Sequence, residues 1–512
     1  MNKASELDNK TIEELKQLVL GLQQKYNLLL EQFKLAQQKR FSHSSEKRPE
    51  QEELFDEADA PTPNPDRAQK EETLTVPEHQ RKRKGQPKRT TIPDYLERER
   101  IEYDIPDEDK VCACGCHKHC MGEEISEQLE VIPPQFKVLQ HVRPKYACRA
   151  CETQGGTGEG VSIASMPKLF LPKSMAGPSL VAYTITNKYI DHLPLYRQEA
   201  IWNRHGFRLP RNTLCGWVMS AYEQVEPLLS LLKEDILKSG YVQADETPVQ
   251  VMKEANQRNQ KKSYMWLFRG DAPPDYIAIL YEYQETREGK HAKSFLENFE
   301  GYLQTDGYKG YDWVNNKSAI THLGCMAHAR RPFAKLMKLA KSSGQSDVVV
   351  KLVGKLYAIE DKAREEKLSH QARFELRQEK SAPILSEIKI WLDKMLPSSP
   401  PKSVFGKGVR YMLDRWQELN NFLKDGRLEV DNNLIENNIR PFAVGRRNWL
   451  FKGSPRGAKA GACFYSLIET CKANNIDPFK YLNYLFTTIP QCKTTKDYRQ
   501  LLPYNVALEN LG

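Results

Sequence analysis

Three carboxylates lie in sequence contexts that could support metal-dependent chemistry on a phosphodiester. Asp245 lies in YVQADETPVQV, which is typical of a strand and contains Glu246 as its one other charge, and Asp306 precedes Gly307, where the backbone can turn sharply. Glu436 lies in DNNLIENNIRP, which is typical of a helix. Two cations ~3.5–4 Å apart, held by such carboxylates, can activate an attacking oxygen and stabilise a leaving oxygen. An aspartate near a turn is more often a cap or turn residue, so the prediction depends on all three together.

The segments around the first two carboxylates predict a mixed sheet. YVQADETPVQV, SYMWLFRG and YIAILYEY are short, aromatic and β-branched, and polar or Pro-containing turns separate them, as in three successive antiparallel strands. A helix at 291–299 and a fourth strand in YLQTDGYKGYD follow. This order opens an RNase H-like sheet, although the same elements allow other topologies.

The helix that contains Glu436 is expected to begin at a cap formed by Asp431 or Asn432 and to end near Pro441. Basic and aromatic side chains alternate within it and just after it: Arg440, Phe442, Arg446, Arg447, Trp449, Phe451 and Lys452. The four basic residues predict contacts with DNA phosphates, and the aromatic rings could stack on an unpaired base. The alternative is a core of aromatic side chains with a solvated basic face.

The segment GCMAHARRPF adds a histidine and two arginines to the candidate site. His328 could contact the scissile phosphate or a carboxylate, while Arg330 and Arg331 hold DNA; a packed structural histidine is the alternative. The chain from about 334 to 396 is dense in Lys, Glu and Leu, which predicts a helical insertion between the strands and the helix of Glu436.

Six of the eleven cysteines fall between Cys112 and Cys151, a clustering that favours a metal site over a disulfide framework. Cys148 and Cys151 form a CxxC pair, and four sulfur or nitrogen ligands in a tetrahedron would bind a structural Zn²⁺. The other ligands must come from CACGCHKHC, whose additional Cys and His residues leave the choice open. Reduced thiols without metal are the alternative.

Two helices upstream of the strands predict a DNA-reading module. The segment 195–205 is amphipathic, GFRLPR supplies a turn, and Asn212 can cap a second helix that includes Leu214 and Trp217. In a helix-turn-helix, the start of the second helix approaches the base edges, so Arg211 and Asn212 are the candidate base contacts. Any pair of antiparallel helices has the same pattern, so a packing role is the alternative.

Length and composition predict several domains and an anionic partner. The 512 residues exceed what one hydrophobic core holds, and Lys plus Arg exceed Asp plus Glu by 76 − 67 = 9. No stretch approaches the ~18–20 apolar residues of a membrane span, and the first residues lack the apolar core of a signal peptide. We therefore expect a cytoplasmic, nucleoid-associated protein with no membrane partner.

The first forty residues contain an apolar seam at spacings of four and three, followed by a polar and highly charged segment. The seam predicts a short coiled coil, or else an amphipathic helix packed on its own domain. The charged segment that follows cannot bury enough apolar surface to fold alone, so it is predicted to be a disordered linker. The seam residues are Leu15, Val19, Leu22, Tyr26, Leu29 and Phe33.

The chain resembles the insertion-sequence-66 family of bacterial DDE transposases, from the N-terminal helix almost to the C-terminus. The matching stretches are RFSHSSEK, ISEQLEVIPPQFKVLQHVRPKYACRACE, YVQADETPVQV, YLQTDGYKGYD, GCMAHARRPF, EVDNNLIENNIRPFAVGRRNWLF and SLIETCKANNIDP. Asp245, Asp306 and Glu436 are by this resemblance the DDE triad, at intervals of 306 − 245 = 61 and 436 − 306 = 130 residues. The resemblance further implies two Mg²⁺ ions per active site, with Mn²⁺ as a substitute, hydrolysis that exposes a 3′-hydroxyl at the element end, and attack of that hydroxyl on target DNA. In the zinc knuckle it implies Cys112 and Cys114 as the partners of Cys148 and Cys151.

The combined prediction is a multidomain protein, mainly α plus α/β. It comprises a coiled-coil helix at 1–40, a charged linker at 41–100, a zinc knuckle at 101–165, a helix-turn-helix region at 166–235, an RNase H-like catalytic domain at 236–455 with its insertion at about 334–396, and a C-terminal helical region at 456–512. The expected partners are double-stranded DNA of transposon ends and target, further copies of the chain, and accessory proteins of the same element. Two alternatives remain: a DNA-binding regulator or accessory protein with an inactive core, and an RNase H-like nuclease without strand transfer.

Overall fold

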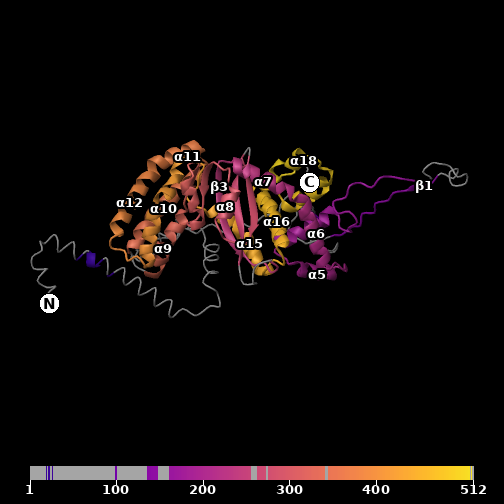
Figure 1. The fold of residues 1–512 in the computed structure, drawn as a ribbon, viewed down its shortest axis with the longest axis horizontal. Helices are drawn as coiled ribbons and strands as arrows, with labels where there is room; N and C mark the ends of the chain where they lie inside the picture. The colour runs from indigo at the N-terminus through magenta and orange to yellow at the C-terminus, as the bar shows by residue number, and fades with distance from the viewer. Residues whose placement is uncertain are drawn as a thin grey trace, which may run out of the picture. The chain divides into compact units, whose positions relative to one another are not determined.

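The computed structural model describes residues 98–100, 128, 135–147, 161–254, 262–272, 275–340, 344–507 and 509, together with 19, 21–23 and 26. Contacts divide the chain into a unit at 68–166 and a larger unit formed by the rest. In the smaller unit, β1 (Lys145–Ala147) pairs antiparallel with β2 (Val161–Ile163). The larger unit contains the sheet and the helices labelled α4 to α18 (Figure 1).

A mixed five-stranded sheet lies at the centre of the larger unit. Its strands are β3 (Tyr241–Val249), β4 (Ser263–Ala272), β5 (Tyr276–Gln284), β6 (Gly301–Gln304) and β7 (Ile320–Leu323), in the order β5-β4-β3-β6-β7. The pairs β3–β4 and β4–β5 are antiparallel, as predicted, whereas β3–β6 and β6–β7 are parallel. The predicted helix at 291–299 is the shorter α8 (Lys290–Phe295). The strand β7 was not predicted, because ITHL is too short and mixed to show a period of two.

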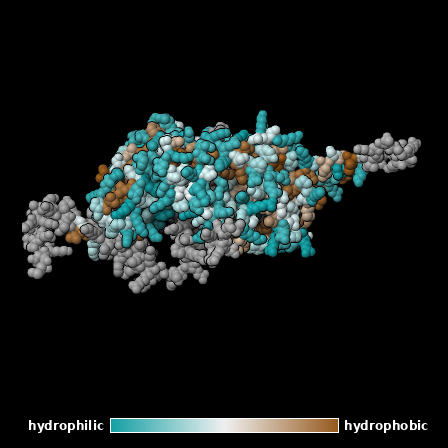
Figure 2. Space-filling model, in the orientation of Figure 1, coloured by the Kyte–Doolittle hydropathy of each residue, from teal (hydrophilic) through white to brown (hydrophobic). Residues whose placement is uncertain are grey.

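Helices surround this sheet and form two hydrophobic cores. The first core joins the sheet to α4 (Pro178–Tyr189), α5 (Leu195–Arg204), α6 (Arg211–Val225), α7 (Pro227–Lys238), α15 (Asn433–Trp449), α16 (Pro455–Ala473), α17 (Pro478–Thr488) and α18 (Thr495–Gln500). The second joins β7 to α9 (Met326–Ala340), α10 (Gln345–Glu365), α12 (Ala382–Met395), α13 (Val404–Asp414) and α14 (Trp416–Asn420), whereas α11 (His370–Leu376) contributes no buried residue. The chain predicted to form a helical insertion, at 334–396, is helical and shares this second core with β7, the start of α9 and the helices α13 and α14. Figure 2 shows mainly hydrophilic residues over the helices on the face that it draws.

The helix α15 does not end near Pro441, as the sequence predicted, but continues to Trp449. A proline inside a helix removes one amide donor and leaves the carbonyl four residues earlier without its usual partner. That carbonyl belongs to Asn437, which is exposed, so water can satisfy it. Asn432 is the N-cap residue, and the Asp431 carboxylate accepts the amide of Asn433 at 3.0 Å, so the predicted start of the helix is confirmed.

Polar side chains of α16 cover the edge strand β5. An uncovered edge strand exposes a row of unpaired backbone groups and invites pairing with another chain. Four helical residues rise about 6 Å and two strand residues rise about 6.7 Å, so side chains four apart on α16 reach alternate amides of β5. The three bonds join Ser466 to the amide of Tyr281 (2.8 Å), Thr470 to that of Ile279 (3.1 Å) and Asn474 to that of Ile277 (2.9 Å).

None of the helices in the described part of the chain is both long enough and apolar enough to cross a membrane.

Candidate active site

The parallel register of β3 and β6 brings Asp245 and Asp306 to neighbouring positions. Gln243 pairs with Gln304, and each aspartate follows its glutamine by two residues, so both point to the same side of the sheet. The two glutamine side chains confirm the shared face, because Gln243 Nε2 donates to Gln304 Oε1 at 2.9 Å. Adjacent strands lie about 4.8 Å apart, so the two carboxylates are close neighbours.

Gly307 allows the chain to turn directly after Asp306. A Cβ atom at position 307 would overlap the ring of Tyr411, so only glycine fits against that ring. Asp306 Oδ1 accepts the backbone amide of Tyr308 at 2.8 Å, and Arg415 donates to the Gly307 carbonyl at 3.1 Å. These bonds fix the turn and therefore the direction of the Asp306 side chain.

Glu436 enters the site from the first turn of α15, which packs against β3. The side-chain amide of Asn432 donates to the Ala244 carbonyl at 3.3 Å, which ties the start of the helix to the residue before Asp245. Burial raises the pKa of Asp245 well above its ordinary value, and the charges of Glu246, Asp306 and Glu436 raise it further. Burial also raises the pKa of Glu436, opposed by His328 and Arg331. The three predicted carboxylates thus lie within electrostatic reach of one another.

A fourth carboxylate, Glu246, supports the site from the other face of β3. It is only 6% exposed, accepts hydrogen bonds from Arg287 Nε (2.7 Å) and the Tyr311 hydroxyl (2.9 Å), and forms an ion pair with Arg287. The Arg287 guanidinium also lies 3.9 Å from the centre of the Tyr308 ring. Burial, and next the charge of Asp306, raise the pKa of Glu246 to about 7. The sequence indicated Glu246 only as a neighbouring charge, and this network was not predicted.

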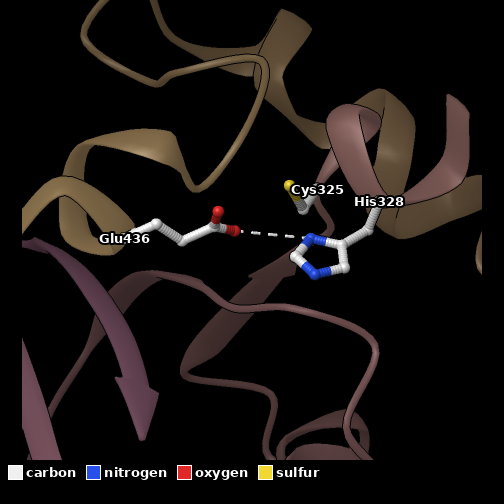
Figure 3. A group of neighbouring side chains, drawn as sticks. All are labelled: Cys325, His328 and Glu436. Atoms are coloured by element: carbon white, nitrogen blue, oxygen red, sulfur yellow. Dashed lines mark ion pairs between the residues drawn. The ribbon is translucent and has the colours of Figure 1, made fainter. Parts of the chain in front are cut away.

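His328 contacts a carboxylate, which was one of the roles predicted for it. Its Nδ1 lies 3.5 Å from Oε1 of Glu436, and Cys325 lies beside both (Figure 3). Cys325 is fully buried, whereas the side chains of His328 and Glu436 are about a fifth exposed. Burial raises the pKa of the Cys325 thiol, as do the charges of Glu436 and Asp431. Cys325, which immediately precedes α9, three residues before His328, was not singled out from the sequence.

The predicted DNA-contacting arginines occupy different environments. Arg331 lies close enough to lower the pKa of Glu436, and Arg330 lies on the same helix, α9. Arg440 and Arg447 are exposed on α15. Arg446 instead donates to the Pro248 carbonyl at the end of β3, so it positions the helix against the strand.

Lys452 is buried rather than open to a phosphate. It is 6% exposed, and its Nζ lies 4.1 Å from the centre of the Trp449 ring and 5.4 Å from that of Tyr189. Burial and the nearby charge of Lys188 lower its pKa well below the ordinary value. This placement differs from the predicted phosphate contact. Of the aromatic residues near it, Phe442 lies in the core, as the alternative predicted, whereas Phe451 is exposed, and its stacking on a base stays a prediction.

The predicted pair of helices is present as α5 and α6, in contact with each other. Arg211 and Asn212 are exposed at the start of α6. Asn212 is not the cap, because the helix begins at Arg211 with Pro210 in the N-cap position.

Two groups of predicted residues lie outside the described part of the chain. They are the zinc ligands Cys112, Cys114, Cys148 and Cys151, and three residues of the N-terminal seam, Leu15, Leu29 and Phe33. Of the other seam residues, Val19, Leu22 and Tyr26 are helical and exposed. The coiled coil at 1–40 therefore stays a prediction.

Comparisons with known proteins cover most of the chain. Residues 173–460 match the family described as Transposase IS66 family, 109–152 match the zinc-finger binding domain of transposase IS66, and 466–504 match the IS66 C-terminal element. Residues 28–101 match a family described as Transposase C of IS166 homeodomain. The chain is 33% identical over 438 residues to the uncharacterized protein y4jD of Sinorhizobium fredii, covering 82% of each. It is 32% identical over 429 residues to y4qI of the same organism, covering 81% of this chain and 77% of that one. No solved structure gives a significant match.

Proposed function

The chain belongs to the IS66 transposase family, and from that premise we propose that it cuts DNA at transposon ends and joins the 3′-hydroxyl to target DNA, using Asp245, Asp306 and Glu436. The observation that supports this most is the gathering of the three carboxylates from β3, the turn after β6 and the first turn of α15. Hydrogen bonds hold the turn after β6 and the start of α15 in place. Asp245, Asp306 and Glu436, which lie far apart in the sequence, would therefore act as one site.

The donor set suits divalent cations that prefer oxygen. The charges of Asp306 and Glu436 raise the pKa of Asp245, and the charge of Asp306 raises that of Glu436. A bound cation pair would relieve this repulsion. Among the described residues, Glu436 Oε1 is buried with no hydrogen-bond partner, which is consistent with a ligand position. Two Mg²⁺ ions, when bound, supply an activated water and stabilise the leaving oxygen. The protein's task is to hold the ligands rigidly and to admit the DNA backbone.

The sheet topology supports the proposed RNase H-like core. Numbered along the chain, the five strands have the order 3-2-1-4-5, with the first three antiparallel and the last two parallel. In this arrangement the carboxylates of the first and fourth strands are neighbours, as are Asp245 and Asp306. We assign the catalytic domain to 236–455, with the insertion at about 334–396.

Basic groups near the site, of which Arg440 and Arg447 are exposed and Arg330 and Arg331 half-buried, would bind the DNA together with exposed groups upstream. We propose that Arg330, Arg331, Arg440 and Arg447 hold phosphates around the cleaved strand, since such contacts position a duplex without reading its sequence. Arg446 would act by positioning α15. The helices α5 and α6 would read the transposon end, with the zinc knuckle and further copies of the chain completing the complex.

The decisive experiment incubates the purified protein with Mg²⁺ and DNA that carries the ends of its own element, and looks for joined products. Asp245→Asn, Asp306→Asn and Glu436→Gln should each abolish cleavage and leave end binding intact, because each change removes charge at nearly constant size. Asp275→Asn, in the turn between β4 and β5, is the matched control and should retain activity.

The outcomes also separate the alternatives. Cleavage within about tenfold of wild type, a loss of about 1.4 kcal/mol, would remove the altered residue from the triad. Cleavage without joined products would favour the nuclease. Specific end binding by the wild type without any cleavage would favour the regulator with an inactive core.

A further inference from the structure

A group of mixed donors lies beside the carboxylate triad, at the junction of α9 and α15. Cys325 immediately precedes α9, His328 lies in its first turn, and Glu436 lies in the first turn of α15. The sulfur of Cys325, one ring nitrogen of His328 and one carboxylate oxygen of Glu436 all lie within 4.8 Å of one another. Figure 3 shows the three side chains pointing toward a common centre.

We propose that Cys325, His328 and Glu436 form a binding site for one thiophilic divalent cation of the Zn²⁺ class, and that its occupation withdraws Glu436 from the magnesium site. The binding itself is independent of the proposed catalytic activity, whereas its inhibitory consequence depends on that activity. A thiolate and an imidazole select softer transition metals, and an all-oxygen set selects Mg²⁺.

The distances match a tetrahedral site with little movement. Ligand atoms about 2.1 Å from Zn²⁺ at tetrahedral angles lie about 3.4 Å apart, and a sulfur about 2.3 Å away lies about 3.6 Å from the others. The observed separation of His328 Nδ1 and Glu436 Oε1 is 3.5 Å. The sulfur lies within 4.8 Å of both other atoms, so it would close the remaining gap by a shift of at most about 1.2 Å, within the reach of a side-chain rotation.

Two polar atoms of this group lack partners that buried groups normally have. His328 Nδ1 and Glu436 Oε1 are buried, and no described residue forms a hydrogen bond with either. Buried polar atoms are nearly always bonded, so an unbonded pair aimed at one point suggests an absent ligand. The 3.5 Å contact between them is an ion pair only when the histidine is protonated.

Two backbone amides point at the sulfur of Cys325 and partly oppose the effect of burial, which keeps the pKa of the thiol well above its ordinary value. Asn432 donates its backbone amide to the sulfur at 3.3 Å, and the backbone amide of His328 acts in the same direction. Amides at a helix N-terminus stabilise a thiolate, as in reactive and metal-binding cysteines. On binding, the sulfur–metal bond replaces the S–H bond, and the proton leaves to solvent.

The site also has an open side. The side chains of His328 and Glu436 are 20% and 19% exposed, whereas Cys325 is fully buried. Three protein ligands with one accessible position allow a water or a phosphate oxygen as the fourth ligand. An ion entering from that side would take up an oxygen of Glu436 and leave the aspartates without their third carboxylate.

Cobalt absorption tests the binding without any assay of activity. Full-length protein already loaded with Zn²⁺ in its knuckle is titrated with Co²⁺ alone, and the thiolate-to-cobalt charge-transfer band is recorded for wild type and variants. Cys325→Ala should remove the band, His328→Gln should weaken Co²⁺ binding at least tenfold, and Cys463→Ala should leave both unchanged. Cys463 is the matched control because it too is fully buried, in α16.

Two results would overturn the proposal. One is a charge-transfer band in Cys325→Ala as strong as in the wild type, and the other is an unchanged affinity of His328→Gln for Co²⁺. Circular dichroism reports whether Cys325→Ala folds; if it does not, His328→Gln decides, because that side chain is partly exposed. In the cleavage assay, micromolar Zn²⁺ should inhibit the wild type in the presence of excess Mg²⁺ and should inhibit His328→Gln far less. If the wild type shows the cobalt band but neither it nor any variant cleaves DNA, the proposed function is refuted, whereas the proposed metal site is still supported.

Discussion

The metal-free protein should lose stability as the pH rises from about 4.5 to about 7, because Glu246 holds its proton to a higher pH when folded. Burial, and next the charge of Asp306, raise the pKa of Glu246 from 4.5 to about 7, against the opposing effect of Arg287. Below pH 4.5 Glu246 is protonated in both the folded and the unfolded chain, so it does not lower the free energy of unfolding. Between the two values the unfolded chain releases a proton that the folded chain retains, so unfolding becomes easier.

The size of this effect follows from the two pKa values. A rise from 4.5 to about 7 corresponds to about 3 kcal/mol of destabilisation, fully present above pH 7. The pKa values of Asp245 and Glu436 are raised as well, so these groups add to the effect with the same sign. Mg²⁺ binds only the folded site and should reverse the loss, by about 2.7 kcal/mol at a hundred times its Kd.

The assay follows denaturant unfolding of wild type and Glu246→Gln between pH 4.5 and pH 8, with chelator and then with Mg²⁺. The variant should have a flatter pH dependence, because glutamine does not titrate. Glu418→Gln is the control: burial raises the pKa of Glu418, but bonds from His322 and Arg415 outweigh this and hold it at about 2. Its stabilising contribution is therefore constant above pH 4.5, so this change should lower stability without altering the slope. Equal slopes for wild type and Glu246→Gln would refute the reasoning.

Three further predictions concern other parts of the chain. Thr470→Val should destabilise the protein by about 1–3 kcal/mol, because it leaves the amide of Ile279 on β5 unpaired at nearly constant volume, and denaturant unfolding measures this; a change within error would contradict the edge-covering role. Arg211→Ala and Asn212→Ala should each weaken binding to the transposon end by about 1–3 kcal/mol more than binding to scrambled DNA, and equal losses would return α6 to a structural role. Protein purified without chelators should contain one Zn²⁺ in the segment 112–151, and metal analysis that finds none would contradict the knuckle.

The sequence predicted the elements that contain the triad because each has a strong local signal. The β-branched and aromatic segment around Asp245 forms β3, and the capped amphipathic segment around Glu436 forms α15. The sequence did not predict that Asp245 and Asp306 would be neighbours in space. Their proximity depends on the parallel pairing of β3 with β6, two strands far apart in the sequence, and the same elements allow other strand pairings.

What the sequence missed depends on tertiary contacts. Burial of Lys452 between two rings, and of Glu246 against Arg287 and Tyr311, requires knowledge of which elements meet. The continuation of α15 through Pro441 has the same cause, since packing of the helix against β3 and the core outweighs one lost hydrogen bond. The sequence predicted a helix end at Pro441 because the prediction considered only the proline and its neighbours in the sequence, not the packing of the helix.

The insertion between Asp306 and Glu436 has a structural role in the site. Arg377, buried in a π-helical turn of the insertion, pairs with Glu360 of α10 and donates to the Leu428 carbonyl at 2.7 Å. Tyr357 of α10 donates to the Asp431 carboxylate at 2.6 Å. These contacts fix the segment 428–432, just before α15. That segment belongs to no helix or strand, so side-chain bonds must set its position.

A charged pair buried in this way contributes little net stability, but removing one partner is costly, since the other charge is left unpaired. The pairing therefore specifies where the segment 428–431 lies rather than adding stability. The insertion thus sets the position from which α15 begins, and with it the distance of Glu436 from the two aspartates. Loss of the Arg377 guanidinium should accordingly displace Glu436 and reduce cleavage, although Arg377 is fully buried and bonds to Glu360, Phe422, Asp425 and Leu428 rather than to the triad.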